Sequence, residues 1–273
     1  MNFDLYKSWR YIASYSALNY LQASAAMLLT LMLASFLTVE TFAEYRVGIT
    51  VFSIVSVAGL YGAEKGLLID LVHRETECLT IFAYFVVRLF VAFGSVAVVT
   101  LFMVPSGALE IVVLFGCIGV LAALRSPGWF DYRMRLRQHA VILFADRTIF
   151  ATLAASAILV LRSDLGAFEL GVMALVATSL TLVVELVILS RFVKETVPSV
   201  GQVHKEAKGI FQRHSWVWFL ALSNMLMTSL GQLVLFARGG SNEIAYLGIA
   251  LQFAMVLRLF MQQVVRLRGP TIA

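Results

Sequence analysis

Charged side chains interrupt several otherwise apolar stretches of this sequence, at similar distances from the ends that face basic loops. A charge in hydrocarbon is costly, so ionisable residues inside membrane spans usually line a polar cavity or pair with one another. A charged layer repeated on five segments therefore predicts a shared interior site, which is typical of transport rather than of simple anchoring. The residues are Lys65, Arg88, Arg147 and Arg258, with Glu64, Asp146 and Glu185.

The composition is that of an integral membrane protein. Hydrophobic residues make up 60% of the 273 residues, charged residues only 14%, and the mean hydropathy is +0.88. Soluble domains are about half apolar and about a quarter charged. The apolar runs are continuous and lack the alternation of a transmembrane β-barrel strand. We therefore expect helices, which satisfy their own backbone hydrogen bonds in the bilayer.

A transmembrane helix needs roughly 20 mostly apolar residues, and the sequence predicts eight such spans. The expected fold class is an all-α integral membrane protein. The fourth span is the shortest. The predicted ranges are 15–37, 46–71, 79–104, 108–125, 139–161, 167–193, 214–236 and 243–266.

Orientation follows from the loop cations, because loops on the cytosolic side carry an excess of Lys and Arg. With a cytosolic N-terminus, the cytosolic segments hold fourteen lysines and arginines, Arg125 among them, and the opposite side holds only Arg46, Arg162 and Arg238. We therefore expect a multi-pass protein of the cell inner (plasma) membrane with both termini in the cytosol. The net charge of +5 is dispersed over these loops, so no nucleic-acid partner is expected.

The longest hydrophilic segment, residues 194–213, contains Pro198 and Gly201 and is expected to be a cytosolic linker. Its second half mixes apolar and basic residues and can form a short amphipathic helix at the membrane surface. The linker separates six spans from two. The expected domains are thus a six-helix N-terminal lobe at 1–193, this linker, and the first two helices of an incomplete C-terminal lobe at 214–273.

A weak internal repeat agrees with two similar lobes. The letters AEYRVGI at 43–49 are matched by IAYLGI at 244–249, and SALN at 16–19 is matched by ALSN at 221–224. Both matches pair the first helical hairpin with the hairpin after the linker. Copies separated by an even number of spans keep the same orientation, which predicts a pseudo-two-fold axis along the membrane normal.

Three stretches carry a family resemblance: LNYLQ at 18–22 through TFAEY at 41–45, WFDYRMR at 129–135, and SNEIAY at 241–246. With the hydrophobic pattern of the whole chain, they resemble the polysaccharide biosynthesis (O-antigen, Wzx-type) flippases of the multidrug/oligosaccharidyl-lipid/polysaccharide exporter superfamily. Members of that family have two complete lobes. The resemblance therefore implies that this chain is a truncated form, with one whole lobe and the start of another.

The resemblance also implies a function. Such a flippase moves lipid-linked oligosaccharide, carried on polyprenyl pyrophosphate, to the outer leaflet for synthesis of cell-surface polysaccharide such as lipopolysaccharide. The expected partners are this substrate, membrane lipids, and polysaccharide polymerase or chain-length proteins. No enzyme activity and no cofactor are expected, and the sequence contains no Walker A loop, zinc-protease motif or serine elbow.

The charged layer then has a specific interpretation. Arginine forks bind phosphate oxygens through charge-assisted, often bidentate contacts, so cations at this depth could load a pyrophosphate in an inward-facing site. Alternatively, long Lys and Arg stems reach out to the cytosolic headgroups, and neighbours such as Asp146 and Arg147 neutralise each other. The candidate substrate ligands are Lys65, Arg88, Arg147 and Arg258, and the candidates for charge balance or ion coupling are Glu64, Asp146 and Glu185.

Three other functions fit parts of the pattern. A drug or cation exporter of the same superfamily would favour carboxylates and aromatic rings, whereas the layer has four cations against three anions. A membrane-embedded polysaccharide polymerase or ligase needs a substantial external loop, and the predicted external loops are short. A non-functional remnant of a flippase gene is the third alternative.

Overall fold

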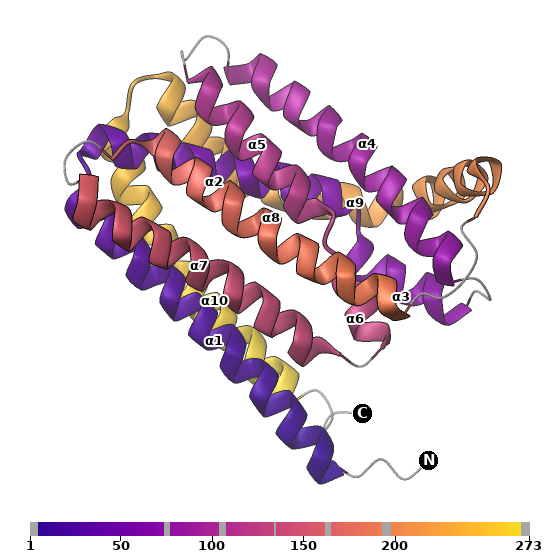
Figure 1. Ribbon diagram of the computed structural model, residues 1–273. Helices are drawn as coiled ribbons and strands as arrows, with labels where there is room; N and C mark the ends of the chain where they lie inside the picture. Colours follow the sequence, from indigo (N-terminus) through magenta and orange to yellow (C-terminus); the bar gives the residue numbers. More distant parts are fainter. Residues whose placement is uncertain are drawn as a thin grey trace.

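The computed structural model describes residues 5–73, 77–103, 108–133, 135–161, 165–192 and 198–268. Within these ranges the ordered elements are helices and there is no strand, which confirms the predicted all-α fold. The helices, drawn in Figure 1, are α1 (Leu5–Phe36), α2 (Val39–Leu60), α3 (Ala63–His73), α4 (Glu77–Met103), α5 (Leu109–Ala123), α6 (Pro127–Tyr132), α7 (Leu136–Leu161), α8 (Ala167–Phe192), α9 (Val200–Ala237) and α10 (Ser241–Arg268).

Seven of the eight predicted spans overlap one helix each, whereas the predicted span 46–71 covers two helices, α2 and α3. In the described residues, six stretches are long and apolar enough to cross a membrane. They lie in α2, α4, α5 with α6, α7, α8 and α9. Helix α1 contains a shorter apolar part, Tyr20–Phe36. Helix α10 has 28 residues, and at 1.5 Å per residue this length also exceeds a bilayer core of about 30 Å.

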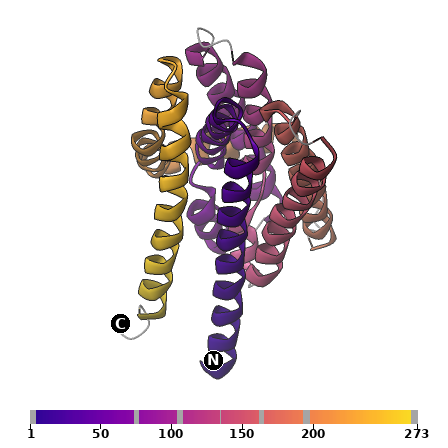
Figure 2. The same ribbon diagram turned by 90° about the vertical axis from the view of Figure 1, so that its left-hand side faces the viewer.

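Successive long helices run up and down between two ends of the bundle (Figure 1). We call the end with the α1–α2 and α9–α10 turns the hairpin end. The opposite end, where α1 begins and α10 finishes, is called the terminal end, and α3 and α6 lie toward it (Figures 1 and 2). Helix α2 is central. Around it, α1, α7, α8, α5, α4, α9 and α10 form a closed ring in which each helix packs against the next.

Small residues let α2 approach α5 and α4 closely. A methyl group at Gly59 would lie 2.5 Å from Cβ of Ala123 and 2.8 Å from Cβ of Ala92. Gly48 is covered by the ring of Phe115 on α5 in the same way. Without a hydrophobic driving force between helices in lipid, such close packing is a main source of association.

The predicted span 46–71 is broken in two. Helix α2 ends at Leu60, and Tyr61 (φ 48°) and Gly62 (φ 69°) adopt the left-handed conformation before α3 begins. A tyrosine in this region is strained. Its ring stacks on Phe211 and Trp218 of α9, with centroid distances of 5.1 and 5.3 Å, and its hydroxyl donates to the carbonyl of Phe211 at 2.9 Å. Contacts from α9 therefore stabilise the break.

Helix α9 also differs from expectation. It begins after Ser199, which forms a capping box with Gln202, and it continues without a break to Ala237. The amphipathic segment is thus part of the same helix as the predicted span, rather than a separate helix. Within this segment Ile210 is buried and Lys208 is exposed, as in an amphipathic helix, but the apolar Phe211 is also exposed. Residues 194–197 of the predicted linker lie outside the described residues.

The close approach of α2 can be tested with one methyl group. Gly59→Ala should lower the free energy of unfolding by about 1–3 kcal/mol, because two Cβ atoms on neighbouring helices must move away. Gly94→Ala on α4 is the matched control, since no atom lies within 4 Å of the added methyl group. Thermal unfolding in detergent micelles compares the two. Equal stability of both variants would contradict the close packing of α2 on α4 and α5.

Candidate functional site

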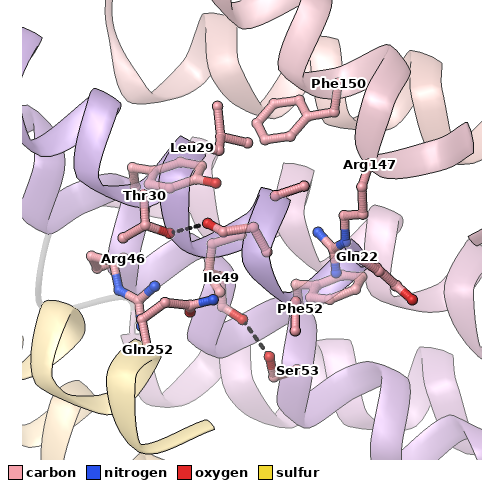
Figure 3. Close-up of a pocket in the computed structure, with 14 residues that line it drawn as sticks. Gln22, Leu29, Thr30, Arg46, Ile49, Phe52, Ser53, Arg147, Phe150 and Gln252 are labelled. Carbon is pink, nitrogen blue, oxygen red and sulfur yellow. Dashed lines mark hydrogen bonds between the residues drawn. The ribbon is translucent and has the colours of Figure 1, made fainter. Parts of the chain in front are cut away.

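A cavity of about 350 Å³ lies between α1, α2, α7 and α10 (Figure 3). It forms where α2 packs toward α5, α4 and α9, while α7 packs on α1 and α8. Its walls combine alanine and aromatic side chains with neutral polar groups and two arginines, and the lining contains no carboxylate among the described residues. The polar side chains are Gln22, Thr30, Tyr45, Arg46, Ser53, Arg147 and Gln252.

Arg46 was predicted to be an external loop residue, and this prediction is wrong. It lies two turns inside α2 and is only 5% exposed. Its Nε donates to no acceptor in the described part of the chain. Figure 3 shows the guanidinium beside the amide of Gln252, at one side of the cavity. A buried guanidinium that borders a cavity with an unsatisfied donor is a strong candidate for binding an anion.

Arg147 lies at the other side of the cavity, near Gln22 in Figure 3. The preceding residue, Asp146, faces α8 instead, because neighbouring residues on a helix point about 100° apart. Its carboxylate accepts hydrogen bonds of 3.3 Å from the hydroxyls of Thr178 and Thr181. Of the seven candidate residues, Arg147 is the one that the described structure places in the main cavity, and its role as a substrate ligand stays a prediction.

Arg88 does not reach the cavity. It is fully buried, and its guanidinium donates to the carbonyl of Arg125 at 2.6 Å and to the hydroxyl of Ser126 at 3.4 Å. Glu185 accepts from the backbone N–H of Ser126 at 2.5 Å. These contacts lie at the break between α5 and α6, where backbone groups lose their helical partners. Arg88 and Glu185 therefore cap this break from α4 and α8.

Arg125 was predicted to be a cytosolic loop residue, but it is 6% exposed inside the bundle. It forms an ion pair with Asp146 at 3.0 Å and donates to the hydroxyl of Thr181 at 2.8 Å. Together with Arg88 and Glu185, these residues form a buried charge cluster of two cations and two anions. The ion pair with Asp146 offsets the cost of burying Arg125.

The cluster and the cavity are neighbours. A smaller void of about 30 Å³ borders Asp146 and Thr178 of the cluster side and shares Arg147 and Phe150 with the main cavity. A balanced set of charges thus lies next to an unbalanced, positive cavity. The side chains of Glu64, Lys65 and Arg258 lie outside the described residues, so the roles expected of them stay predictions.

A second polar cluster joins α3, α4 and α9. The carboxylate of Asp70 accepts from the Tyr84 hydroxyl at 3.0 Å, lies 3.2 Å from Nε2 of His214, and forms an ion pair of 3.2 Å with Arg213. Burial raises the pKa of Asp70, but the hydrogen bonds from His214 and Tyr84 and the charge of Arg213 outweigh it and lower the pKa to about 2. Sequence reasoning did not find this cluster, because its members are far apart in the chain.

Fold and site together define a multi-pass, all-α membrane protein with an arginine-lined cavity between its helices. Among the described residues, no group of three His, Cys, Asp or Glu side chains could hold a metal ion. Comparisons of the chain with protein-family models, with curated proteins and with solved structures give no match. The flippase resemblance therefore stays a prediction made from the sequence.

The buried charge cluster predicts a large effect of removing one partner. Arg125→Leu should lower the free energy of unfolding by about 3–5 kcal/mol, because it leaves the carboxylate of Asp146 buried without its partner. The double variant Arg125→Leu/Asp146→Leu should recover part of this loss. Thermal unfolding in detergent measures both, with exposed Arg191→Leu as the control. If the double variant is instead less stable than Arg125→Leu alone, the pairing of Arg125 with Asp146 is contradicted.

The lowered pKa of Asp70 predicts an acid dependence of stability. The carboxyl has an ordinary pKa of 3.8 and a folded-state pKa of about 2. Its ionised form therefore stabilises the fold at pH values above about 4, and this contribution is lost as the pH falls toward 2. Asp70→Asn should make the loss of thermal stability between pH 4 and 2 shallower than in the wild type. An identical acid dependence in both proteins would argue against the contacts of Asp70 with Tyr84, Arg213 and His214.

Proposed function

We propose that this protein is a membrane transporter of the flippase type, which translocates lipid-linked oligosaccharide or polysaccharide precursors for cell-surface polysaccharide synthesis. One observation carries the proposal. The described lining of the cavity in the apolar bundle holds two arginines and no carboxylate. Its volume of about 350 Å³ is in the range of about 300–1,000 Å³ that small-molecule sites occupy.

The lining suits an anionic sugar conjugate. Guanidinium groups such as those of Arg46 and Arg147 bind phosphate oxygens by paired, charge-assisted hydrogen bonds. The amides of Gln22 and Gln252 both donate and accept, so they can hydrogen-bond to sugar hydroxyls. The surrounding apolar walls strengthen each of these polar contacts by lowering the local dielectric constant. The proposed substrate is therefore a saccharide that carries a phosphate or pyrophosphate link to a lipid.

In this proposal the buried charge cluster does not line the cavity. It fixes the orientation of α7, which forms part of the cavity wall. The ion pair of Asp146 with Arg125, and the hydrogen bonds from Thr178 and Thr181, fix the rotation of α7 about its axis. This rotation turns Arg147 toward α1 and α2. Coupling of transport to an ion gradient through Asp146 and Glu185 is a secondary proposal, since Asp146 is already paired with Arg125 and Glu185 already accepts from the backbone of Ser126.

The orientation of the proposed transporter rests on its basic residues. The terminal end carries exposed cations on several helices, including Arg133, Arg137, Lys205 and Lys208. Loops rich in Lys and Arg usually lie in the cytosol, so we infer that this end faces the cytosol and that the hairpin end faces outward. Transport would then run from the cytosolic to the outer leaflet of the inner membrane. A drug or cation exporter fits the cavity less well, because its cationic substrate would be repelled by both arginines.

Proteoliposomes test the proposal directly. Protein is reconstituted with a fluorescent disaccharide linked to polyprenyl pyrophosphate, and a membrane-impermeant quencher reports how fast the label changes leaflet. Arg147→Gln should slow translocation about tenfold or more, because it removes one charged phosphate ligand. Arg191→Gln, at the exposed end of α8, is the control and should keep the wild-type rate. Wild-type liposomes no faster than protein-free liposomes would overturn the proposal.

A further inference from the structure

Helix α10 contributes one face to the cavity wall. Ala245, Gly248 and Gln252 follow one another at helical spacing and point toward α2; Ala245 and Gly248 are buried, and Gln252 lines the cavity. Gly248 has no side chain of its own to contribute. At this residue, however, the backbone of α10 comes very close to Arg46, which lines the cavity.

The side chain of Arg46 lies directly against the backbone of Gly248. A methyl group at position 248 would be 3.0 Å from Cγ and 2.9 Å from Cδ of Arg46, and closer still to Nε. Favourable carbon contacts need about 3.5–4.0 Å. Any residue other than glycine would therefore displace the stem of Arg46, or push α10 away from α2.

The stem position decides where the guanidinium lies. Arg46 starts on α2, close to the hairpin end, and its head reaches the amide of Gln252 at the cavity (Figure 3). Its Nε has no acceptor in the described residues, and no ion pair in that part of the chain holds the head in place. Packing against Gly248 is therefore one of the contacts that set the direction of this buried side chain.

We propose that Gly248 is a positioning residue that holds Arg46 as the second anion ligand of the cavity, opposite Arg147. Helix α10 is then an integral part of the binding site, and the affinity for anions falls when α10 moves away from α2. The inference rests on the proposed function, since it assumes an anion in the cavity. It adds that Arg46 on α2 and Arg147 on α7 form the anion-binding pair, and that Gly248 on α10 holds Arg46 in position.

Calorimetric titration of inorganic pyrophosphate into nanodisc-embedded protein tests the inference. Gly248→Ala should weaken binding about tenfold or more, and Arg46→Gln should weaken it to the same degree. The double variant should bind no more weakly than either single variant, because both changes act through the same guanidinium. Gly231→Ala on α9 is the matched control, since no atom lies within 4 Å of its added methyl group. It should bind like the wild type.

The outcomes separate the inference from the function on which it rests. A wild type that binds no pyrophosphate overturns the anion-binding cavity itself. A wild type that binds, with an unaffected Gly248→Ala variant or with additive losses in the double variant, overturns the role of Gly248 alone. If Gly248→Ala does not fold, Arg46→Ala is added, because it removes the side chain that the methyl group meets. Failure of this second change to restore the fold also overturns the role of Gly248.

Discussion

The structure depends on the high cost of leaving polar groups without partners inside a bilayer. Two helices of the bundle break, and side chains from distant segments satisfy each break. Arg88 and Glu185 cap the break between α5 and α6, while the Trp218 indole donates to α2 just before Tyr61. These contacts fix α4, α8 and α9 against the central helices. The neighbouring ion pair of Arg125 with Asp146 also joins α7 to this region, and Arg147 is the next residue on α7.

The position of the cavity follows from how closely α2 packs against its neighbours. Glycines and alanines draw α2 toward α5 and α4, whereas the opposite face of α2 borders the cavity and α7 packs on α1 and α8. Charges are separated into two environments. In one, Arg125 and Asp146 neutralise each other; in the other, Arg46 has no carboxylate beside it within the described lining. A solute that brings its own negative charge would complete the second environment as Asp146 completes the first.

The sequence predicts the helices well because long apolar runs have few other stable states in lipid. The break at Tyr61 was not predicted, since the predicted span runs on to residue 71 and the stabilising residue Phe211 lies 150 positions away. Arg46 and Arg125 were misplaced because basic residues near the ends of apolar runs usually mark loops. The position of Arg88 along its helix could be counted, but the direction of its side chain could not. One residue of shift turns a side chain by about 100°.

The unbroken length of α9 has a mechanical consequence. Its 38 residues extend about 57 Å at 1.5 Å per residue, nearly twice the hydrocarbon thickness of about 30 Å. Its first turns carry the face with Lys208 outward, and much further along the rod Gln232 accepts a hydrogen bond from Thr50 in the core. No helix end separates these regions. A pull of lipid headgroups on the basic start of α9 would therefore be transmitted along the helix to its contact with the central helix α2.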